Sequence, residues 1–180
     1  MTALRLLLTV PILLTSFSLA GGAGPRLIPT LPTLPGAQPV SGSRCVPGFV
    51  QPSPAALARD LAAARRRWSA SGIRAYSFDF DQIAQPVRFP KTRITVGVGG
   101  KVSLTESVPG GASPYAATAT VEKLFEFVQQ GVAYARREPC SELGVRYARE
   151  GYPLSYASEL RLVNIADGGA SFTVSRFTRR

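Results

Sequence analysis

Asp79 and Asp81 are the residues of this chain whose type and spacing come closest to a catalytic or metal-binding pair. They lie two positions apart in an alternating run, so both carboxylates point to the same side of a predicted strand. Such a pair is the starting point for a divalent-ion site or for general acid–base chemistry. A solvent-facing strand produces the same spacing, and Arg93 or Lys91 on a following strand would pair with these carboxylates. We favour the ion-pair interpretation, because no third acidic residue lies near in sequence.

Lys101 and Ser103 also share a predicted strand face, which is the arrangement of a Ser–Lys dyad. The chain contains no histidine, which excludes imidazole bases, Ser-His-Asp and Cys-His catalysis, and imidazole-bound metals. It also lacks a nucleophile elbow, a phosphate loop and a dinucleotide fingerprint. We therefore predict no catalytic residue, no metal ligand and no cofactor, and we expect a protein that is not an enzyme.

The chain carries 21 lysines and arginines against 11 acidic residues, a formal net charge of +10, and nearly all of its cations are arginines. A guanidinium group binds carboxylates and phosphates as a planar fork. The candidate contacts for an anionic partner are Arg59, Arg66 and Arg67 in a predicted helix and Arg93 in a predicted strand. The interpretation that we favour over a dedicated anion site is that these arginines form solvated surfaces that aid solubility.

Three segments differ in composition. Residues 1–23 combine a basic start, an apolar run at 6–20 and a cluster of small residues, which is typical of a secretory signal peptide cleaved after Ala20 or Ala23. The apolar run is shorter than the roughly 20 residues of a spanning helix, so we expect no stable membrane span after cleavage. Residues 24–52 form a proline-rich spacer, and residues 53–180 a single domain. The predicted location is periplasmic or extracellular.

Cys45 and Cys140 are the two cysteines of the chain. In an exported protein, an even cysteine count most simply indicates one disulfide. This bond would attach the end of the spacer to the folded domain.

The elements that position these residues are predicted from caps and periodicity. A helix begins after Ser53 and buries Trp68, and a strand follows from Tyr76. Glycines at 99–100 indicate a hairpin, and a second helix begins after Thr120. Three more strands complete the order helix, three strands, helix, three strands. We predict an α+β fold, in which two helix-plus-three-strand units form an antiparallel sheet with both helices on one face, so that the opposite face is wet.

Six short motifs occur in a characteristic order between about residues 62 and 177. They are Trp68, Tyr76-Ser77-Phe78, Arg93-Ile94-Thr95-Val96, the run at 120–125, Val145-Arg146-Tyr147 and Gly151-Tyr152-Pro153. In this order the chain resembles an exported bacterial family known as the domain of unknown function numbered 6174. Members often carry a Cys-x-Cys pair where this chain has Ile-Ala-Gln-Pro at 83–86, so no redox or metal role of that pair carries over. The resemblance implies an exported, envelope-associated domain, and implies no activity or ligand.

The functional expectation is a secreted or periplasmic, non-enzymatic module that binds an envelope protein or an anionic polymer. One alternative is a metal-dependent or carboxylate-based enzyme that uses Asp79 and Asp81. The other is a structural partner in a larger assembly. We expect no nucleic-acid partner, because the chain is predicted to be exported and contains no RNA-binding signature.

Overall fold

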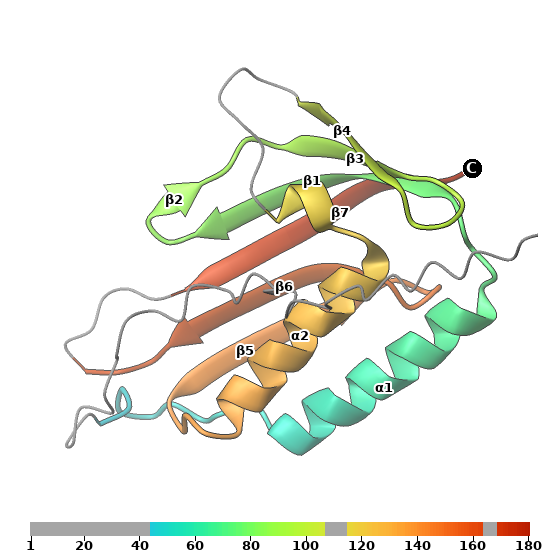
Figure 1. Ribbon diagram of the computed structural model, residues 1–180. Helices are drawn as coiled ribbons and strands as arrows, with labels where there is room; N and C mark the ends of the chain where they lie inside the picture. Colours follow the sequence, from blue (N-terminus) through green and yellow to red (C-terminus); the bar gives the residue numbers. More distant parts are fainter. Residues whose placement is uncertain (1–43, 107–114, 164–168) are drawn as a thin grey trace, which may run out of the picture. The chain divides into compact units, whose positions relative to one another are not determined.

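The computed structural model describes residues 44–106, 115–163 and 169–180 (Figure 1). The predicted signal peptide and most of the predicted spacer lie outside the described residues.

Two α-helices, a short 3-10 helix and seven strands make up the described part of the chain (Figure 1). In chain order the elements are α1 (Pro54–Ala70), β1 (Tyr76–Ala84), β2 (Val87–Arg88), β3 (Thr92–Val96), β4 (Val102–Glu106), η1 (Ala116–Thr118), α2 (Val121–Ala135), β5 (Ser141–Tyr147), β6 (Pro153–Leu160) and β7 (Ala170–Arg179). The strands form one antiparallel sheet in the order β4-β3-β1-β7-β6-β5, and β2 pairs with β1. The strands before α2 and those after it therefore occupy separate halves, which meet at the β1–β7 pair.

The predicted α+β class is confirmed, and both helices lie on the same face of the sheet (Figure 1). The helices begin at the predicted caps: the Ser53 hydroxyl accepts a hydrogen bond from the Ala56 amide, and the Thr120 hydroxyl accepts one from the Lys123 amide. These caps satisfy amide groups that have no partner within the helix.

The strand count differs from the prediction at one place. The sequence predicts a connection over residues 82–90, which contain Pro86 and Pro90, but β1 continues to Ala84 and the chain returns as the two-residue strand β2. A strand of two residues is too short to show an alternating pattern in the sequence. The first unit therefore contains four strands instead of three.

Aromatic side chains fill the space between α1 and the sheet. The Trp68 ring meets the edges or faces of Tyr76, Tyr152 and Phe177 at centroid distances of 5.4, 6.2 and 6.1 Å. Gly151, which has a φ of +104°, lies beneath the same helix, and a Cβ atom there would stand 2.2 Å from the Ala64 carbonyl oxygen. Only glycine permits this approach, so the β5–β6 turn packs directly against α1.

Helix α2 packs through its own aromatic contacts. The Phe127 ring meets Tyr156 at 4.9 Å and Phe172 at 5.7 Å. The buried hydroxyl of Tyr76 accepts a hydrogen bond of 2.9 Å from the Val121 amide, which joins β1 to the first turn of α2. The core therefore lies between the two helices and one face of the sheet.

Cys45 and Cys140 form a disulfide. Beside it, Cys45 makes an isolated antiparallel bridge with Leu162, and the Val46 amide donates to the Arg161 carbonyl at 2.8 Å. The covalent bond therefore joins the segment before α1 to the sheet near the start of β5.

Residues 44–52 belong to the folded unit, although the sequence placed them in the spacer. The Gln51 side-chain amide donates to the carbonyl oxygens of Ala135 and Glu138 at 2.7 and 2.8 Å, where α2 ends. The bond to Ala135 caps a carbonyl group in the last turn of α2, where the helix itself supplies no partner.

No helix in the described ranges is both long enough and apolar enough to span a membrane.

Candidate functional site

Asp79 lies on the face of the sheet that points away from the helices, yet its side chain is only 2% exposed. Arg93 Nη1 donates to Asp79 Oδ1 at 2.9 Å, and Arg176 donates to Oδ2 through Nε and Nη2. The expectation that this face is wet is therefore wrong at Asp79 and at the neighbouring Ser77, which is 1% exposed. Arginine side chains from both neighbouring strands lie against these residues. We call Asp79, Arg93 and Arg176 the clamp.

The clamp joins three adjacent strands. Arg93 on β3 also donates to the Arg176 carbonyl at 2.9 Å and to the Ser77 hydroxyl at 2.8 Å, and so reaches across β1 to β7. Arg176 has a φ of +48°, and the β1–β7 register shifts between Ser77 and Asp79, opposite this residue. A non-glycine residue in this region costs roughly 1–2 kcal/mol. The contacts of the clamp hold Arg176 in place despite that cost.

The charge of Asp79 is set by two opposing effects. Burial alone would raise the pKa of this carboxyl, but hydrogen bonds from Arg93 and Arg176 outweigh burial and lower the pKa below its ordinary value of 3.8. Asp79 is therefore a carboxylate throughout the neutral range, with a guanidinium group on each oxygen.

Asp81 lies on the same face of β1 but has a different partner. Its Oδ2 atom pairs with Arg88 Nη2 on β2 at 3.3 Å. Each of the two aspartates therefore engages arginine rather than the other carboxylate. Across the described ranges, no group of three or more carboxylate and cysteine side chains gathers closely enough to hold a metal ion.

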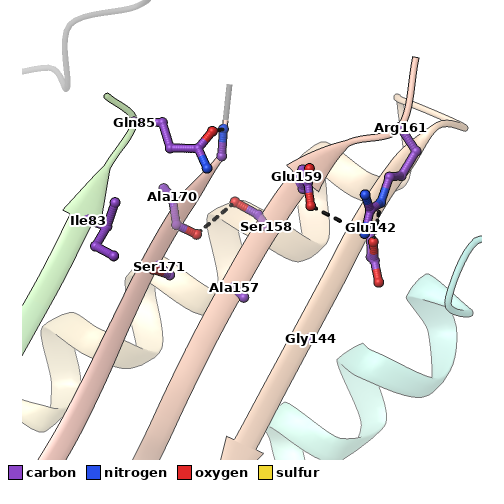
Figure 2. A pocket seen from close by; sticks show the side chains of 11 residues that line it. Ile83, Gln85, Glu142, Gly144, Ala157, Ser158, Glu159, Arg161, Ala170 and Ser171 are labelled. Atoms are coloured by element: carbon purple, nitrogen blue, oxygen red, sulfur yellow. Dashed lines mark hydrogen bonds and ion pairs between the residues drawn. The ribbon is translucent and has the colours of Figure 1, made fainter. Parts of the chain in front are cut away.

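The same face carries a shallow hollow of about 310 Å³ near the ends of β5, β6, β7 and β1 (Figure 2). Gly144, Ala157 and Ser171 are direct cross-strand neighbours and form its floor. The helices lie behind the strands in Figure 2, so the hollow opens away from them. At its rim Arg161 binds both Glu142 and Glu159, so these charges are engaged with one another.

On helix α1, in contrast to the clamp, several arginine side chains are exposed and are not paired with carboxylates of the described residues. Arg59 and Arg66 are exposed on α1 and stand seven residues apart, close to two helical turns, so they share one side of the helix. That side faces away from the buried residues Leu61, Ala64 and Trp68. Neither arginine side chain forms an ion pair or a hydrogen bond with another described residue.

Arg67 is also exposed on α1, on the flank nearest the β5–β6 turn. Its side chain likewise forms no ion pair or hydrogen bond within the described ranges. Of the four arginines predicted to contact an anion, Arg59, Arg66 and Arg67 therefore lie on one helix. Arg93 lies on the opposite side of the sheet and is bound to Asp79.

Arg65 and Arg136 also lie on the outer surface of the helices, and no motif in the sequence distinguishes them as candidate contacts. The Arg65 guanidinium donates to Gln129 Oε1 at 2.8 Å and lies 5.6 Å from the centre of the Phe125 ring. Arg136 caps the end of α2 and is exposed. We call the exposed side of α1 and α2 that carries Arg59, Arg65, Arg66 and Arg136 the basic helical face.

These features define a small disulfide-bonded α+β protein in which two helices cover one face of an antiparallel sheet and present unpaired arginines. Residues 60–179 match the model of a family of unknown function, DUF6174, and the chain belongs to that family. Neither the curated proteins nor the solved structures contain a match to this chain.

Proposed function

We propose that this protein is an exported, non-enzymatic module that binds an anionic partner through its basic helical face. The observation that carries the proposal is that Arg59 and Arg66 point outward from α1, and that neither side chain forms an ion pair with a described residue. Guanidinium groups without a partner in the protein are available to carboxylates or phosphates from another molecule.

The distribution of the acidic residues supports this proposal. Six of them already contact a lysine or an arginine of the same chain: Asp79, Asp81, Glu126, Glu142, Glu150 and Glu159. Within the described ranges, several arginines on the helices, Arg59, Arg66 and Arg67 among them, form no such ion pair.

The strength of such contacts favours a partner with several charges. One exposed ion pair contributes roughly 0.2–1 kcal/mol, and salt screens it over about 8 Å at physiological ionic strength. A single carboxylate would therefore bind weakly. A chain of carboxylates, on a polymer or a protein segment, would engage several arginines together.

Two further observations support the remaining parts of the proposal. The Cys45–Cys140 bond suits an oxidising compartment, in keeping with a periplasmic or extracellular location. The absence of histidine from the sequence and the arginine partners of Asp79 and Asp81 favour a binding role over catalysis.

Retention on a polyglutamate matrix, eluted with a salt gradient, tests the proposal. The test variant is Arg59→Ser/Arg66→Ser. The control is Arg146→Ser/Arg149→Ser, which removes the same charge from exposed positions on β5 and the turn after it, where neither side chain has an ion pair among the described residues. The helical variant should elute at lower salt than the control. Equal elution of the two variants would overturn the proposal, because net charge alone would then explain retention.

A further inference from the structure

A partly open hollow of about 440 Å³ lies between α1 and α2. Its apolar lining consists of Ala58, Leu61 and Ala62 from α1 and Val132 and Ala133 from α2. The alanines are small, and so the space between the helices is left open where larger side chains would close it. We call this feature the interhelical hollow.

Two arginines of the basic helical face line the interhelical hollow. Arg65 is held by Gln129 and by the Phe125 ring, so its guanidinium group has a defined position at one end. Arg136 lies at the other end, and it forms no ion pair with any residue in the described ranges. An occupant that complements the hollow therefore has an apolar group for the alanines and an acidic group for each arginine.

On the other side of Arg65, the charged side chains between the two helices are acidic instead of basic. A second hollow of about 290 Å³ is lined by Arg65, Trp68, Phe125, Glu122 and Glu126. Glu122 accepts a hydrogen bond from Trp68 Nε1 at 2.9 Å, and Glu126 pairs with Lys123. These carboxylates would repel an acidic group, so the acidic groups of an occupant belong between Arg65 and Arg136.

From this lining we infer that the partner is a protein segment in which an apolar side chain lies between acidic ones, and that this segment occupies the interhelical hollow. This inference rests on the proposed function and specifies its partner. An anionic polymer without apolar groups would engage the arginines and leave the alanine-lined space unfilled. A segment with leucine between acidic residues would use both.

Fluorescence polarisation with two labelled peptides tests the inference. One peptide is Asp-Glu-Leu-Leu-Glu-Asp, and the other is Asp-Glu-Gly-Gly-Glu-Asp, which has the same charge. We expect the wild-type protein to bind the leucine peptide about tenfold more tightly, the ratio expected when one aliphatic side chain is buried. Arg136→Ala should weaken the binding of both peptides.

Two phenylalanine variants locate the preference. Ala62→Phe fills the interhelical hollow from an exposed helix position and should abolish the preference for leucine. Ala70→Phe, at an exposed position of the same helix away from the hollow, should leave the preference unchanged. Circular dichroism establishes that both variants fold.

The outcomes separate the inference from the proposed function. If polyglutamate retention depends on Arg59 and Arg66 but the leucine peptide shows no preference, or no measurable binding, the inference is overturned and the proposed function stands. The inference is also overturned if Ala62→Phe leaves the preference intact. If the helical variant and its charge-matched control elute together, the proposed function itself fails.

Discussion

On the open face of the sheet, Arg93 and Arg176 turn toward a carboxylate of the same chain, whereas Arg59 and Arg66 on α1 point away from the protein. Arg93 and Arg176 share the buried carboxylate of Asp79, and Arg93 lies directly opposite Asp79 in the β1–β3 register. Neither the Arg59 nor the Arg66 side chain forms an ion pair within the part of the chain that the structure describes. The same residue type therefore stabilises the fold on one face and is available for binding on the other.

This difference shows why the total charge of the protein says little about where it binds. The role of an arginine depends on whether the fold brings a carboxylate to it. The sequence predicts both Arg59 and Arg93 as contacts for an anion, but the strand register places Arg93 opposite Asp79. Substitutions on the two faces should therefore affect different measurable properties.

Removal of the disulfide should produce the largest effect, and it should affect stability without altering the charge of either face. Cys45→Ser/Cys140→Ser opens a link between residues 95 positions apart. In the chain-entropy model, this lowers the free energy of unfolding by about 4 kcal/mol. Urea denaturation measures the loss. An unchanged unfolding midpoint would show that the link does not restrict the unfolded chain.

Removal of one arginine from the clamp should be the next largest effect. Arg93→Ala leaves Asp79 buried with a single cationic partner, and we expect a loss of about 3 kcal/mol in the free energy of unfolding. The control is Arg59→Ala on the helical face, which should change stability by no more than about 0.5 kcal/mol. Similar losses for the two variants would remove the distinction between the faces.

The effect of pH on the stability difference between wild type and an Asp79 variant should report the ionisation of the clamp carboxylate. Because the pKa of Asp79 is lowered in the folded protein, its ionised form contributes stability above its ordinary value of 3.8. That contribution is lost as the pH falls from there through the folded-state pKa. The stability difference between wild type and Asp79→Asn should therefore be constant above about pH 5 and shrink at lower pH. A difference that stays constant down to pH 2 would contradict the role assigned to this carboxylate.

The elements with strong local signals were predictable from the sequence. Each of these signals needs only a few consecutive residues. The structure confirms the helix caps at Ser53 and Thr120 and the glycine turn at 99–100. The two-residue strand β2 has no such pattern, because the alternation needs more residues to appear.

The surroundings of the charged groups depend on contacts between distant residues. Arg176 is 97 positions from Asp79, and the irregularity that places it appears only once β7 pairs with β1. Arg65 and Arg136 line one hollow because α1 and α2 pack side by side. Neither arrangement produces a pattern among neighbouring residues in the sequence. The sequence therefore indicates that arginine is important, but it does not show which arginines stabilise the fold and which are available for binding.

The central claim is that the arginines of the helices bind an anionic partner whereas those of the clamp stabilise the fold. The most direct test compares the affinity for soluble polyglutamate of Arg59→Ser/Arg66→Ser and Arg146→Ser/Arg149→Ser, which have equal net charge. We predict that the helical variant binds about fivefold more weakly than the control while its free energy of unfolding stays within about 0.5 kcal/mol of wild type. Equal affinities of the two variants would contradict the claim.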